Sequence, residues 1–180
     1  MCGIRSTFAS EKEIVCVISP QTTLRKGEQR KGDCNMETKF YKCPVCGNVI
    51  VKAVDSGMTP MCCGKTMLEL KPNVLEEKTE SHMPVAEITS EDTVLSNCDP
   101  FYLYHCGRRY HTKVLVGNKP HPMNKEHKIC FVYYETENGG QIRYLKAGMP
   151  AEVCFYSTDK PKAIYSYCNI HGLWKVNLFD

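Results

Sequence analysis

Four closely spaced cysteines constrain this sequence more than any other feature. Cys43 and Cys46 lie in the segment C-P-V-C-G, and Cys62 and Cys63 lie in C-C-G after fifteen intervening residues. Two tight turns of this kind bring four thiolates together, and four soft anionic sulfurs favour tetrahedral zinc or iron. Spacing alone leaves a structural zinc ribbon open. Because adjacent ligands such as Cys62 and Cys63 distort the tetrahedron, we favour iron.

The total number of cysteines, the apolar runs and the net charge indicate the cellular compartment of the protein and its possible partners. Twelve cysteines in 180 residues, without an N-terminal secretory pattern, indicate metal or redox chemistry rather than a disulfide framework. We therefore expect a cytoplasmic protein. No apolar run approaches the roughly 20 residues that span a bilayer, so we expect no membrane partner. The net charge of +3 gives no reason to expect a nucleic-acid partner.

The hydrophobic pattern divides the chain into three parts. Residues 1–35 are predicted to form a poorly ordered extension, and 36–71 a compact cysteine-containing domain. Residues 72–180 are rich in short β-branched and aromatic runs with turn signals between them, which predicts an antiparallel β-sandwich. The expected strands lie at 114–116, 129–134, 142–145, 153–156 and 164–167, and a hairpin turn is expected at 138–140. Cys130 and Cys154 are expected to be buried as small apolar residues.

Five possible metal ligands occur in this β-rich part. They are His82, His121, His127, Cys168 and His171. The spacings H-x5-H and C-x2-H allow one loop to supply two donors to one ion. Spacing alone also leaves open that these are unrelated loop residues.

From about Glu37 to the C-terminus the sequence closely resembles desulfoferrodoxin, the two-iron class of superoxide reductase. The resemblance rests on C-P-x-C with C-C-G, and on E-x-H-x-P-V, H-P-M-x3-H and C-N-x-H-G-L-W. It implies a mainly β fold, with a small desulforedoxin-like domain followed by an immunoglobulin-like sandwich, in a homodimer. It also implies an Fe(Cys)4 centre and an Fe(His)4(Cys) centre with Cys168 as the axial ligand. The implied reaction is one-electron reduction of superoxide to hydrogen peroxide, with rubredoxin or a similar protein as the external donor.

The implied ligands suit that reaction. Four neutral imidazoles and one thiolate leave ferrous iron with a net charge of about +1, which attracts an anion. Five protein ligands leave one coordination position open, and a thiolate donates electron density to the iron. Two alternatives remain: an iron protein that transfers electrons without catalysis, and a zinc-ribbon binding module.

Two departures from the family pattern affect this interpretation. The family usually has Glu-Lys-His before the first ligand, whereas this chain has Glu80-Ser81-His82. Glu80 is retained, and the resemblance implies that it ligates or shields ferric iron. The lysine that steers superoxide is missing, and we considered Lys78 or Lys125 as substitutes. The second departure is an insertion at about 90–112. We interpret it as a surface loop or hairpin extension, with a third metal site at Cys98, His105, Cys106 and His111 as the alternative.

Overall fold

The computed structural model describes residues 38–75, 78–93 and 107–179. All of them belong to one compact unit, Cys34–Asp180. The predicted extension at 1–35 lies outside the described residues, as do Cys98, His105 and Cys106. Among the described residues, no helix is both long and apolar enough to cross a bilayer.

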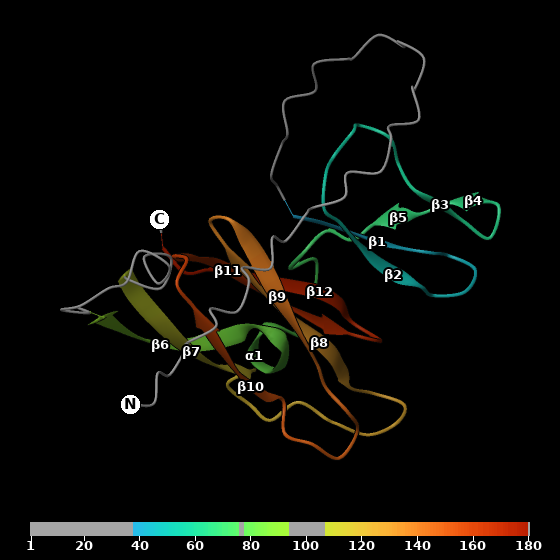
Figure 1. Cartoon of the computed structure of the whole chain (residues 1–180). Coiled ribbons are helices and arrows are strands. Elements are labelled where there is room, and N and C mark those ends of the chain that lie inside the picture. Colours follow the sequence, from blue (N-terminus) through green and yellow to red (C-terminus); the bar gives the residue numbers. More distant parts are fainter. Residues whose placement is uncertain (1–37, 76–77, 94–106, 180) are drawn as a thin grey trace, which may run out of the picture. The chain divides into compact units, whose positions relative to one another are not determined.

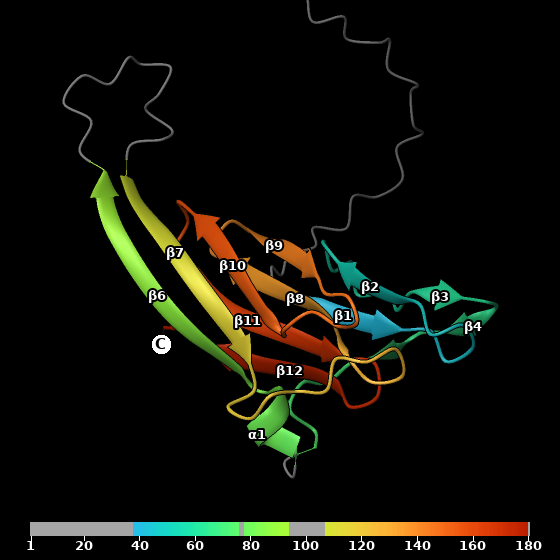
Figure 2. The same cartoon turned by 90° about the horizontal axis from the view of Figure 1, so that it is seen from below.

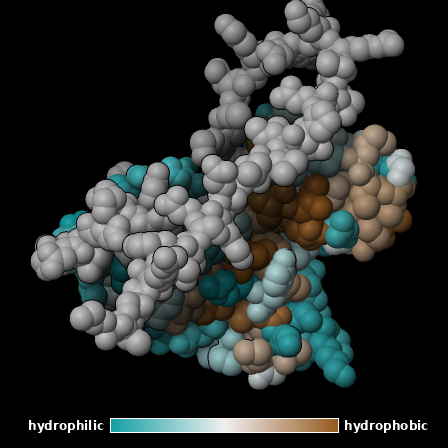
Figure 3. Space-filling model, viewed as in Figure 1, coloured by the Kyte–Doolittle hydropathy of each residue, from teal (hydrophilic) through white to brown (hydrophobic). Residues whose placement is uncertain are grey.

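The cysteine-containing segment forms two small antiparallel sheets (Figure 1). One has the strand order β2-β1-β5, and the other pairs β3 with β4. Their bounds are β1 Lys39–Lys42, β2 Val49–Lys52, β3 Met61–Cys62, β4 Lys65–Thr66 and β5 Leu68–Glu69. Apolar surface gathers over these sheets (Figure 3), and the exposed side chains there include Val45, Met58, Met61 and Leu68.

The rest of the unit is a sandwich of two antiparallel sheets. Their strand orders are β10-β7-β6 and β12-β11-β8-β9. Figure 2 shows β6 and β7 as two long curved strands side by side, paired from Pro84 and Val116 to Thr93 and Gly107. One short helix, α1 Thr79–His82, precedes the first strand. The strands are β6 Pro84–Thr93, β7 Gly107–Val116, β8 Ile129–Thr136, β9 Gly139–Tyr144, β10 Glu152–Ser157, β11 Pro161–Cys168 and β12 Gly172–Asn177.

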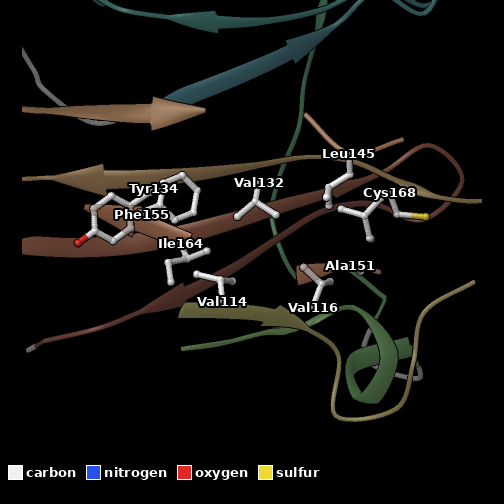
Figure 4. Packing of buried hydrophobic residues seen from close by; sticks show 10 residues of the cluster. Val114, Val116, Val132, Tyr134, Leu145, Ala151, Phe155, Ile164 and Cys168 are labelled. Carbon is white, nitrogen blue, oxygen red and sulfur yellow. The ribbon is translucent and has the colours of Figure 1, made fainter. Parts of the chain in front are cut away.

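A buried cluster between the two sheets forms the main core (Figure 4). Alternate residues of β7, Val114 and Val116, face this cluster, as the period of two in a strand requires. The rings of Tyr134 and Phe155 stack at 4.9 Å, and the Tyr134 hydroxyl lies 3.1 Å from Thr112 Oγ1, which satisfies both buried hydroxyls. Each large side chain buried here contributes about 1.5–3 kcal/mol.

A second buried cluster joins β1 to the sandwich. Phe40, in β1, packs against Phe131 of β8 and Tyr165 of β11. The segment between β5 and α1 is also bound to the sandwich: Asn73 Nδ2 donates to the Lys175 carbonyl, and the Lys175 amide donates to Asn73 Oδ1. Because the two parts share this cluster, the predicted division into domains 36–71 and 72–180 stays a prediction.

The predicted fold class, a small metal-binding segment followed by an antiparallel sandwich, is confirmed. The expected strands correspond to parts of β7 to β11, and β8 and β9 form the expected hairpin. Three features were not predicted: α1, β6 and β12. Residues 90–93 pair with 107–110 and lengthen β6 and β7, which agrees with the hairpin extension interpreted at about 90–112. The expectation that Cys154 is buried is wrong, because Cys154 is exposed. Cys130 is half-buried. Val153 and Phe155 pack into the core, so alternation directs Cys154 outward.

Candidate metal centres

The four predicted cysteines come together at two turns. Cys43 follows β1, Cys46 lies in the next turn, and Cys62 and Cys63 lie at the turn between β3 and β4. Their sulfurs lie within 4.8 Å of one another. Gly47 and Gly64 have φ values of +74° and +71°, a conformation that glycine adopts without strain, and each follows a cysteine of the group.

The spacing of these sulfurs fits a tetrahedral metal ion. A metal–sulfur bond of about 2.3 Å places the sulfurs of a tetrahedron about 3.8 Å apart. Cys62 Sγ lies 3.7 Å from Cys46 Sγ and 3.8 Å from Cys63 Sγ, close to that separation and far longer than a disulfide bond. The sequence spacing therefore produces a group that can hold zinc or iron.

Backbone hydrogen bonds lower the pKa of one thiol in this group, and neighbouring sulfurs raise the pKa of another. The backbone amide of Cys46 donates to Cys43 Sγ, as does that of Val45, and these bonds lower the pKa of Cys43 to about 6. Interaction with Cys43 and the other nearby sulfurs raises the pKa of Cys62 to about 12. Four sulfurs this close ionise together only if a cation balances their charge.

The second group collects donors from four separate segments. His82 ends α1, His121 and His127 lie in the loop between β7 and β8, Cys168 ends β11, and His171 lies in the turn before β12. Their ligand atoms all lie within 4.8 Å of one another. His82 Nε2 lies 3.0 Å from His121 Nε2 and 2.8 Å from His171 Nδ1. Cys168 Sγ lies 3.6 Å from His171 Nδ1.

Burial favours the neutral form of three imidazoles in this group. Desolvation lowers the pKa of His82 and of His171, and it lowers the pKa of His121 to about 4. Burial also raises the pKa of the Cys168 thiol, so a nearby cation is needed to favour its thiolate. Neutral nitrogens that converge beside a buried sulfur cannot all satisfy one another by hydrogen bonds, but they match the donors that iron accepts.

Neighbouring groups orient two of the histidines. His82 Nδ1 lies 2.8 Å from the Lys78 carbonyl, and His121 Nδ1 lies 2.5 Å from the Pro122 carbonyl. A proton on each Nδ1 leaves Nε2 free to ligate. Ser81 Oγ adds a contact of 3.0 Å to His82 Nδ1.

Trp174 covers the inner side of the group. Its ring stacks on the His82 ring at 5.0 Å, and 1% of Trp174 is exposed. Cys168 is also fully buried, whereas His127 and His171 are half-buried. Solvent therefore reaches the group at His127 and His171 and not at the sulfur.

A close backbone contact fixes α1 against the loop that carries His121. The Gly117 amide donates to the Met83 carbonyl, and the Asn118 and Lys119 amides donate to the Glu80 carbonyl. A Cβ on Gly117 would lie 2.6 Å from the Ser81 carbonyl oxygen. The absence of a side chain at position 117 therefore allows His82 and His121 to meet.

Glu80 lies at the surface beside these ligands but outside the donor group. Its carboxylate forms an ion pair with Lys119, which lowers the pKa of Glu80. The substitution of Lys78 or Lys125 for the family's lysine stays a prediction; the charge of Lys78 adds to burial in lowering the pKa of His82 and of His171. Lys119 was missed because no local pattern connects it to a residue 39 positions earlier.

The fold and the two donor groups define a class: a β-sandwich metalloprotein with a four-cysteine group and a four-histidine, one-cysteine group. The sequence model of the family Desulfoferrodoxin matches residues 74–177. A desulfoferrodoxin from Syntrophotalea carbinolica is 30% identical over 136 residues, which cover 76% of this chain and 93% of that protein. A superoxide reductase from Pyrococcus horikoshii is 31% identical over 113 residues, covering 54% and 85% of the two chains.

A solved structure agrees with these sequence matches. The superoxide reductase from Treponema pallidum superposes with a TM-score of 0.56 at 26% identity, covering 78% of this chain and 98% of the other. The chain belongs to the desulfoferrodoxin family. This family binds iron, and both donor groups described above can hold a metal ion.

Proposed function

We propose that this protein is a superoxide reductase that reduces superoxide to hydrogen peroxide by one electron and two protons. The observation that carries the proposal is the group of four imidazoles gathered with the buried sulfur of Cys168. In this proposal His82, His121, His127, His171 and Cys168 ligate one iron, and Cys43, Cys46, Cys62 and Cys63 ligate another. The first iron, when bound, supplies the electron that superoxide accepts.

The protein's own residues prepare the site for this reaction. Four neutral imidazoles leave part of the positive charge of the iron uncompensated, which favours an anionic substrate. The Cys168 thiolate donates electron density from the buried side. Trp174 and the core exclude water there, so substrate reaches the site from its more exposed ligands, His127 and His171.

The resemblance supports three further parts of the proposal. The protein is cytoplasmic, receives electrons from a rubredoxin-like donor and forms a homodimer. Exposed apolar residues on the small sheets, among them Met58 at 73% and Met61 at 69%, support contact with a second copy. Sedimentation would show a dimer if this part is correct.

The central test combines a metal count with stopped-flow mixing against superoxide. We expect two irons per chain and oxidation by superoxide of the iron that the four histidines and Cys168 hold. Cys168→Ser should abolish that oxidation while retaining the absorption of the four-cysteine centre. Cys130→Ser, which changes a half-buried cysteine outside both donor groups, is the matched control. Zinc-loaded protein would favour a binding module, and two irons without superoxide oxidation would favour electron transfer alone.

A further inference from the structure

A buried row of aromatic rings runs from the strand before the four-cysteine group to the residue before Cys168. Phe40 in β1 lies three positions before Cys43. Its ring stacks on Phe131 with centroids 5.9 Å apart, and Phe131 stacks on Tyr167 at 5.3 Å. Tyr167 is bonded to Cys168 through the backbone.

The packing around this row is continuous and excludes water. The exposed fractions of Phe40, Phe131 and Tyr167 are 1%, 7% and 5%. Phe131 and Tyr167 are directly paired across β8 and β11. A second contact crosses the same junction, because the ammonium of Lys42, the neighbour of Cys43, lies 5.9 Å from the centre of the Tyr167 ring.

We propose that Phe40, Phe131 and Tyr167 form an electron relay from the four-cysteine centre to the centre that contains Cys168. An electron tunnels more readily through bonded and closely packed atoms than through water, and the backbone connects this row to a sulfur ligand at each end: Phe40 is three residues from Cys43, and Tyr167 is next to Cys168. One electron leaves the four-cysteine centre, which is oxidised, and enters the second centre, which is reduced. No bond forms or breaks and no proton moves. The inference rests on the two iron centres of the proposed function.

The relay gives the four-cysteine centre a role in turnover. Each superoxide oxidises the second centre by one electron, and the relay restores the reduced state from within the same chain. The external donor then replenishes the four-cysteine centre. Packing alone would require only that the rings fill space between β1 and the sandwich.

The test follows the absorption of the ferric four-cysteine centre. Fully reduced protein loaded with two irons is mixed with less than one equivalent of superoxide in a stopped-flow instrument. We expect the second centre to be oxidised first and the four-cysteine centre to follow in a single exponential with a rate independent of protein concentration. A four-cysteine centre that stays reduced, or a rate proportional to protein concentration, would overturn the relay.

Variants separate the relay from packing. Phe131→Leu and Phe40→Leu each interrupt the row and should slow the internal step without changing either reduction potential. Phe155→Leu is the matched control, because it removes a fully buried stacked ring from the other cluster. If both row variants transfer as fast as this control, the assigned path is wrong.

A second oxidant distinguishes failure of the relay from failure of the proposed function. Less than one equivalent of hexacyanoferrate(III) oxidises either centre without superoxide, and an exchange of the oxidised state between the centres at a rate independent of protein concentration then reports internal transfer. Such exchange with this oxidant, without any oxidation of the protein by superoxide, would overturn the proposed function and retain the relay.

Discussion

Gly117→Ala tests whether the close contact between α1 and the following loop holds His82 and His121 together. Gly117 has φ +85°, and an added Cβ would lie 2.6 Å from the carbonyl oxygens of both Ser81 and Lys119. The left-handed conformation costs a residue with a side chain roughly 1–2 kcal/mol. The steric overlap with backbone atoms adds about 1–3 kcal/mol, as in other overpacked sites. The sum is a loss of about 2–5 kcal/mol.

Gly148→Ala supplies the control for this prediction. Gly148 also has φ +85°, but an added Cβ meets nothing within 4 Å. It should cost only the conformational part, about 1–2 kcal/mol. Urea unfolding measures both changes, and the absorption of each iron centre shows which one is affected. We expect Gly117→Ala to weaken iron binding at the histidine centre while the four-cysteine centre keeps its spectrum. Equal losses of stability for the two variants, with both centres intact, would refute the reasoning.

Two other predictions concern charge. Ser81→Lys adds a cation next to His82 of the histidine centre, and a unit charge acting over about 8 Å in water should raise the second-order rate with superoxide about two- to threefold. The gain in rate should disappear at high salt. Lys119→Gln, which removes a cation, should lower the rate. If Ser81→Lys is no faster than the unchanged protein at low salt, anion steering is contradicted. The second prediction concerns Asp55. Its carboxylate accepts hydrogen bonds from Lys39, at 2.6 Å, and from Lys52. These bonds hold the pKa of Asp55 below the ordinary range. Because the folded pKa is lowered, this stabilisation is present above the unfolded pKa of about 3.9 and is lost as pH falls below it. Asp55→Asn should therefore lower the urea midpoint at pH 6 and lower it less at pH 3, whereas an equal difference at both values would exclude this linkage.

The sequence was sufficient to predict which ligands come together when those ligands are close in the chain. C-x2-C and C-C each lie within one turn, so the short chain between the cysteines limits where their sulfurs can lie. The same holds for Cys168 and His171, which are three residues apart. His82 lies 39 positions before His121, and only the family resemblance connected it with the other donors. Spacing also left the metal open, because zinc and iron share a tetrahedral geometry.

The parts that were missed depend on contacts between distant segments. β6 was not predicted because its sequence, PVAEITSEDT, is largely polar, and its pairing with β7 supplies the hydrogen bonds that keep it extended. Trp174 both packs in the core and covers the site, because the core ends at the His82 ring. The Lys119 and Glu80 pair depends on how the loop after β7 returns to α1.

The wide separation of the histidine ligands has a consequence for the life of the protein in the cell. His82 and His171 are 89 positions apart, so the unfolded chain cannot assemble this donor group, and iron binds almost only to the folded form. Free iron at one hundred times its dissociation constant therefore adds about 2.7 kcal/mol to the stability. When iron is scarce that contribution disappears, and the iron-free chain unfolds and is degraded more often. We expect the cellular amount of this protein to follow the supply of its metal even when its synthesis is constant.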